Sequence, residues 1–97
     1  MIKCLKFYAD WCGPCRVMTP IFEKVSQNPK FNNVKFEELD IDSNDNTTLV
    51  ANLKIRNIPT IILMMENQVI ARQVGTIDED GLTKWVENGL ELCQDML

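Results

Sequence analysis

Histidine is absent from this 97-residue sequence, and cysteine occurs at only four positions. A structural zinc site needs four cysteine or histidine ligands, usually supplied by two closely spaced pairs. One such pair is present, Cys12 and Cys15, whereas the other two cysteines, Cys4 and Cys93, lie far apart in the sequence. The sequence therefore argues against a metal site and leaves thiol chemistry as the favoured use of the pair.

Basic residues are too few for a protein that binds nucleic acid or an anionic membrane. Ten lysines and arginines face 14 acidic residues, which gives a net charge of −4. No apolar run is long enough to span a bilayer. Lys3 and Lys6 interrupt the start of the chain, which lacks the apolar stretch and cleavage site of a secretory signal. We therefore expect a soluble, cytoplasmic, monomeric protein without nucleic-acid or membrane partners.

The spacing of apolar residues predicts an α/β fold with the element order βαβαββα. The expected strands are 2–9, 34–41, 60–65 and 69–74, and the expected helices are 16–27, 46–53 and a last helix capped by Asp78. Apolar residues on both sides of the first strand are typical of a central strand covered by helices on both faces. The many charges of strand 34–41 indicate a sheet edge. No linker or repeat divides the chain, so we expect one domain over residues 1–97.

Helical spacing also predicts which side chains enter the core. The core-facing residues expected in the first and last helices are Val17, Met18, Ile21, Phe22, Val25, Leu82, Trp85, Val86, Leu90 and Cys93. Cys93 and Cys4 are therefore expected to be buried without a redox role, as free cysteines commonly are. In the turn between the last two strands, at residues 66–68, Asn67 is the residue expected to tolerate a left-handed backbone conformation.

The segment Trp-Cys-Gly-Pro-Cys at residues 11–15 lies where the first strand passes into the first helix. Free amide hydrogens and the helix dipole stabilise an anion at a helix start, and a thiolate is such an anion. We therefore predict that Cys12, at the helix edge, is the attacking sulfur and that Cys15 is the resolving sulfur. Pro14 suits the first helical position, where a missing amide hydrogen costs nothing.

Three motifs together resemble the thioredoxin family. They are Trp-Cys-Gly-Pro-Cys after an apolar strand, Ile58-Pro59-Thr60, and Gly75 after a further strand. Their order and spacing are highly specific, and the likeness covers nearly the whole chain. It implies the minimal thioredoxin fold, a four-stranded mixed sheet flanked by three helices, without the extra N-terminal strand and helix of longer members. It also implies a redox-active disulfide between Cys12 and Cys15 and no bound cofactor.

The resemblance further implies the residues around the sulfurs. Pro59 should follow a cis peptide bond and face the cysteines, which leaves the Ile58 backbone free to pair with an extended substrate. The alternative is an ordinary trans proline that opens a strand. The residues expected to form the substrate-binding surface are Trp11, Gly13, Pro14, Ile58 and Gly75.

Lys6 departs from the family pattern. Thioredoxins usually place a buried aspartate at this position and a lysine on the neighbouring strand, where this chain has Glu38. Two interpretations of this reversed pair stay open. Either Lys6 and Glu38 serve proton transfer at Cys15, or the Lys6 ammonium extends to solvent and pairs only structurally. Arg16 likewise either adds positive potential near the cysteines or is only solvated.

By resemblance, the function is protein-disulfide reduction in electron transport and cell redox homeostasis. Cys12 attacks a substrate disulfide, a mixed disulfide forms, and Cys15 releases the reduced product. An NADPH-dependent thioredoxin reductase would supply the electrons. One alternative is a glutaredoxin-like enzyme that uses glutathione, favoured by the short chain and the turn at residues 75–78. Another is a non-catalytic accessory subunit of a larger assembly, whose fold matters rather than its sulfurs.

Overall fold

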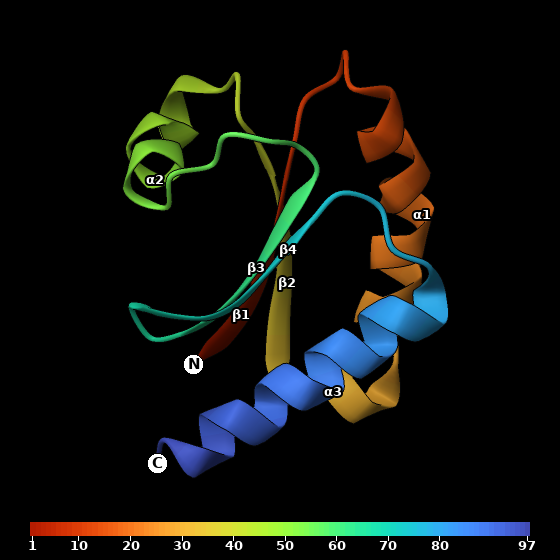
Figure 1. The fold of residues 1–97 in the computed structure, drawn as a ribbon, viewed down its shortest axis with the longest axis vertical. Helices are drawn as coiled ribbons and strands as arrows, with labels where there is room; N and C mark the ends of the chain where they lie inside the picture. Colours follow the sequence, from red (N-terminus) through yellow and green to blue (C-terminus); the bar gives the residue numbers. More distant parts are fainter.

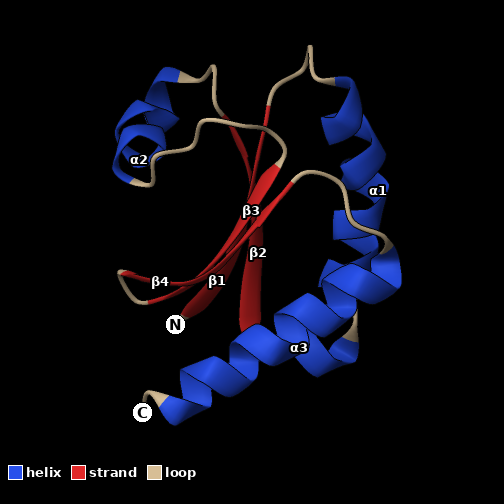
Figure 2. Ribbon diagram, viewed as in Figure 1, coloured by secondary structure: helices blue, strands red, loops and turns tan.

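The computed structural model describes residues 1–97 and arranges them in three layers, with a twisted sheet between helices (Figures 1 and 2). The element order βαβαββα is confirmed. The elements are β1 (Ile2–Tyr8), α1 (Gly13–Ser26), β2 (Val34–Asp40), α2 (Thr47–Asn52), β3 (Thr60–Met65), β4 (Gln68–Val74) and α3 (Glu79–Asp95), with short 3-10 turns at Pro29–Phe31 and Asn44–Asn46. No helix has both the length and the apolar composition required to cross a membrane.

The four strands form one mixed sheet in the order β2-β1-β3-β4. β1 is parallel to β2 and antiparallel to β3, and β3 is antiparallel to β4. The charged strand β2 therefore lies at an edge, as its composition predicts. In the β1–β2 register Lys6 lies opposite Glu38, so the reversed pair comes together through strand pairing alone.

A hydrophobic core fills each face of the sheet. Because successive strand residues point to opposite faces, Cys4 of β1 packs with Phe22 of α1 and Leu82 of α3, whereas Leu5 and Phe7 pack beneath α2. Figure 1 shows the same division, with α2 on one side of the sheet and α1 and α3 on the other. β1 is therefore the central element, and the loop that follows it is held between two packed layers.

The helix starts agree closely with the capping signals. Asp78 caps α3 and accepts a hydrogen bond from the Gly81 amide at 2.8 Å, as predicted. α1 begins at Gly13, three residues before the expected start at residue 16 and one residue before the start that would make Pro14 the first helical residue. Cys12 is the N-cap, so Gly13 is the first helical residue and Pro14 the second. Both positions tolerate proline, because neither amide has a partner within the helix.

Two local predictions are wrong. The left-handed residue in the β3–β4 turn is Glu66, with φ of 54°, rather than Asn67. The Glu66 amide and carboxylate both bond to Met1, which lies 65 residues earlier in the sequence, and local turn preferences do not reveal this contact. Val17 is exposed, because the buried stripe of α1 runs through Cys15, Met18, Phe22 and Val25. Val17 lies outside this stripe despite its apolar character.

Candidate redox site

The loop between β1 and α1 carries the paired cysteines. Cys12 and Cys15 form a disulfide with their Cα atoms 5.3 Å apart. Cys12 keeps 6% of its surface exposed and Cys15 only 2%, so solvent reaches Cys12 more readily. The burial order matches the predicted roles of an outer attacking sulfur and an inner resolving sulfur.

The start of α1 supplies positive potential to the Cys12 sulfur. Cys12 Sγ accepts a hydrogen bond from the Cys15 amide at 3.2 Å, so the sulfur itself caps the helix. The first turn of α1 contains no acidic residue that would oppose the helix dipole. A thiolate formed at Cys12 on reduction would meet the free amides of the first turn, an arrangement that stabilises anions.

The three sequence motifs converge beside the disulfide. The Ile58–Pro59 peptide bond is cis, which confirms the prediction, and the trans alternative is wrong. Ile58 packs against the cysteine pair, and its carbonyl oxygen lies 3.9 Å from Cys12 Sγ. The Gly75 amide donates to the Pro59 carbonyl at 2.9 Å, with Gly75 at φ of 87°, where glycine carries no steric penalty. Gly75 therefore holds the proline turn in place.

The surface around Cys12 is open. Trp11 is exposed, and its indole Nε1 donates to Asp42 Oδ2 at 2.9 Å, which fixes the ring at the rim of the loop. Gly13 and Pro14 are exposed beside it, and Ile58 is half-buried. Of the residues predicted to contact substrate, Gly13 and Pro14 begin α1, and Trp11, Ile58 and Gly75 lie on loops at the carboxyl end of β1.

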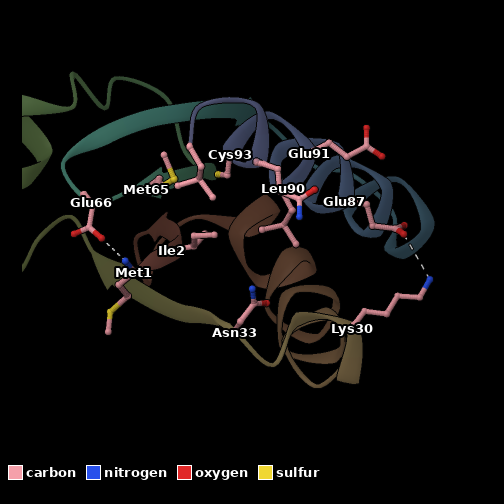
Figure 3. A pocket seen from close by; sticks show the side chains of 12 residues that line it. Met1, Ile2, Lys30, Asn33, Met65, Glu66, Glu87, Leu90, Glu91 and Cys93 are labelled. Carbon is pink, nitrogen blue, oxygen red and sulfur yellow. Dashed lines mark hydrogen bonds and ion pairs between the residues drawn. The ribbon is translucent and has the colours of Figure 1, made fainter.

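The larger of two surface pockets, about 550 Å³, lies elsewhere. It is at the opposite end of β1, beside the C-terminal half of α3, and includes Ile2, Leu90, Cys93 and the carboxylates of Glu66 and Glu87 (Figure 3). Neither cysteine of the disulfide lines it. The location of the reactive sulfurs, rather than the size of a cavity, identifies the redox site. Around the two buried sulfurs, Trp11, Gly13 and Pro14 are exposed.

Lys6 is fully buried, with 0% of its side chain exposed. Its Nζ donates to Glu38 Oε1 and to Thr19 Oγ1, each at 2.8 Å, and lies 5.5 Å from the ring centroid of Tyr8 and 5.9 Å from that of Phe22. The interpretation that Lys6 extends to solvent is therefore wrong. Its strand is central and its side chain points beneath α1, so no path along the surface is open to it. Glu38, at 32% side-chain exposure, is the member of the pair that meets water.

Thr19 is the site residue that the sequence analysis missed. Its hydroxyl accepts from Lys6 and donates to the Cys15 carbonyl at 3.2 Å. The sequence does contain one indication of this role, since Thr19 follows Cys15 by four residues within a predicted helix. A threonine hydroxyl in a helix commonly donates to the carbonyl four residues earlier. Arg16, in contrast, donates from Nη2 to the Asp10 carbonyl at 2.7 Å, so it is tied to the loop rather than only solvated.

The remaining two cysteines are buried, as predicted, and they differ from the redox pair in being unpaired thiols rather than in burial, since Cys15 is as little exposed as Cys93. Cys4 is 0% exposed, and Cys93 is also buried. Burial raises the pKa of the Cys4 thiol from 9.0 to about 12 and also raises the pKa of Cys93. Both therefore stay protonated at neutral pH, and the protonated thiol is a poor nucleophile.

These differences predict selective alkylation of the reduced protein. At neutral pH, iodoacetamide should modify Cys12 first, whereas Cys4 and Cys93 should react only after unfolding in urea, as followed by peptide mass spectrometry. The unfolded chain releases the Cys4 proton near pH 9.0 and the folded chain only near pH 12. The stabilisation that comes from keeping the Cys4 thiol protonated is therefore fully present below pH 9.0. The free energy of unfolding decreases as the pH rises from 9.0 toward 12. Rapid labelling of Cys4 in the folded protein would contradict the assignment.

Comparison with known proteins gives one consistent family. A family model described as Thioredoxin matches residues 2–88. The chain is 34% identical over 85 residues to a thioredoxin of Buchnera aphidicola, covering 88% of this chain and 76% of that protein. It is 35% identical over 83 residues to a thioredoxin of Haemophilus influenzae, covering 84% and 74%. The solved thioredoxin of Malassezia sympodialis superimposes with a TM-score of 0.79 at 30% identity, over 91% of this chain and 74% of that one.

Proposed function

The chain belongs to the thioredoxin family, and on this basis we propose that residues 1–97 act as one catalytic domain that reduces protein disulfides through a mixed disulfide with Cys12. The protein is a thioredoxin-type dithiol oxidoreductase, with a redox-active Cys12–Cys15 disulfide and no bound cofactor. The observation that carries the proposal is the Cys12 sulfur capping α1 beside the Ile58–Pro59 turn.

The reaction proceeds by two successive exchanges. The Cys12 thiolate attacks one sulfur of the substrate disulfide, and the electron pair of the broken bond leaves with the other sulfur, which takes up a proton. Cys15 then loses its proton and attacks Cys12 Sγ. The Cys12–Cys15 disulfide forms, and the second substrate sulfur leaves as a thiolate. The greater exposure of Cys12 and the burial of Cys15 support this division of roles.

The substrate segment binds in an extended conformation across the loop surface. Ile58 offers backbone groups next to Cys12, in the manner of a strand added to a sheet edge. Trp11, Gly13, Pro14 and Gly75 complete the contact surface. The exposure of Trp11, Gly13 and Pro14 supports this assignment.

Lys6 and Glu38 assist proton transfer at Cys15. The buried ammonium stabilises negative charge as the Cys15 thiolate forms, and the partly exposed Glu38 connects Lys6 with solvent. The 2.8 Å contact between them and the position of Lys6 beneath the first turns of α1 support this role.

The electron source is tested by reduction of insulin, whose freed B chain precipitates. We place the activity in the cytoplasm and expect fast turbidity with NADPH and thioredoxin reductase, and slower turbidity with glutathione and glutathione reductase. The control is the double variant Cys12→Ser, Cys15→Ser. Turbidity with glutathione alone would instead indicate the glutaredoxin-like alternative. No cleavage even with dithiothreitol would overturn the proposed function and favour an accessory role.

A further inference from the structure

Thr19 joins the buried Lys6 charge to the cysteine motif. Its hydroxyl accepts from Lys6 Nζ at 2.8 Å and donates to the Cys15 carbonyl at 3.2 Å. Two hydrogen bonds therefore separate the ammonium from the backbone of the resolving cysteine. Because the single hydroxyl proton points at the carbonyl, the oxygen lone pairs are free to face Lys6. The two hydrogen bonds thus reinforce each other.

We infer that Thr19 is a positioning residue that holds the Lys6 ammonium against the first turns of α1, where the charge favours the dithiol form over the disulfide. The inference rests on the proposed dithiol–disulfide exchange. The disulfide is neutral, whereas the reduced pair includes a thiolate. A positive charge held two hydrogen bonds from the Cys15 backbone therefore stabilises the reduced form relative to the disulfide.

The surroundings make this charge difficult to displace. Lys6 is flanked by the rings of Tyr8 and Phe22, and its only polar side-chain neighbours with hydrogen bonds to Nζ are Glu38 and Thr19. Glu38 lies on β2, so it draws the ammonium toward the sheet edge. Thr19 lies on α1, so it draws the ammonium toward the cysteines. Loss of the Thr19 hydroxyl should leave Lys6 bound to Glu38 alone and weaken its effect on the sulfurs.

Equilibrium with glutathione measures this effect directly. Two glutathione thiols give two electrons to the Cys12–Cys15 bond and become one glutathione disulfide, and their protons pass to the protein sulfurs or to solvent. The reduced fraction is read by mass spectrometry after acid quenching and alkylation, over a series of glutathione ratios. The variants are Thr19→Val, which keeps the shape without the hydroxyl, and Thr19→Ser, which keeps the hydroxyl.

We expect Thr19→Val to lower the equilibrium constant for reduction about threefold to tenfold, as loss of a charge-assisted hydrogen bond predicts. Thr19→Ser should match the parent. In a Lys6→Met background, Thr19→Val should have no further effect, because no charge is left to position. Circular dichroism confirms folding, and Thr19→Ala replaces the valine variant if that one unfolds.

Three results overturn the inference. An unchanged equilibrium constant in Thr19→Val, with lower stability alone, assigns Thr19 a structural role. An equal decrease of the equilibrium constant in the parent and in the Lys6→Met background would show that the effect of Thr19 does not depend on the Lys6 charge. In both cases the parent protein still exchanges with glutathione, so the proposed function stands. A parent protein that fails to exchange would remove the proposed function and the inference together.

Discussion

Serine in place of Cys12 is expected to abolish disulfide reduction, whereas serine in place of Cys15 is expected to trap the mixed disulfide. The thiolate is the nucleophile, and a serine hydroxyl at the start of α1 has no base that would activate it. The Cys12→Ser variant should therefore lose roughly a thousandfold or more of its insulin-reduction rate. The Cys15→Ser variant keeps the attacking sulfur that caps the helix but has no sulfur to release the product.

The trapped complex is measurable on a non-reducing gel as a band that contains both proteins and disappears with dithiothreitol. Cys93→Ser is the matched control, because Cys93 is a buried thiol at the far end of α3 and should leave the rate unchanged. Full activity in Cys15→Ser would contradict the assignment of Cys15 as the resolving sulfur. A trapped complex with Cys12→Ser instead would reverse the two roles.

Glu38→Gln is expected to lower the free energy of unfolding by about 2 kcal/mol, more than Lys6→Met does. Removing one member of a buried ion pair costs about 3–5 kcal/mol, because a charge is left buried without its counter-ion. Glu38 is 32% exposed, so water screens the pair and reduces this figure. Lys6→Met removes the buried charge itself and leaves Glu38 in contact with solvent. Its effect on stability should therefore be small or favourable.

Urea unfolding at neutral pH, followed by circular dichroism, gives both free energies. The matched control is Glu37→Gln on the same strand, since Glu37 pairs with the exposed Lys35 at 3.2 Å. Surface pairs contribute at most about 1 kcal/mol, so this variant should stay close to the parent. Equal decreases in the free energy of unfolding of Glu38→Gln and Glu37→Gln would contradict this prediction. They would show that burying the Lys6 charge does not require Glu38 as its counter-ion.

Sequence patterns were sufficient for the fold because they depend on short-range rules. Alternation along β1 assigned Cys4 and Leu5 to opposite faces, and the charges of β2 placed it at the sheet edge. The cis bond before Pro59 was predicted by resemblance, since composition alone favours trans. The prediction for Asn67 failed because the left-handed position is Glu66, whose amide and carboxylate bond to Met1, a long-range contact that local turn preferences do not contain.

The sequence by itself determined the cysteine motif at a strand–helix junction, the order of the elements and the presence of a reversed charge pair. Only the tertiary structure decided that Lys6 is enclosed, that Glu38 meets water and that Thr19 stands between Lys6 and Cys15. The physical reason is that a long side chain has many rotamers, and its path depends on which neighbours surround it. Those neighbours come from β2 and α1, and strand register and helix packing bring them together.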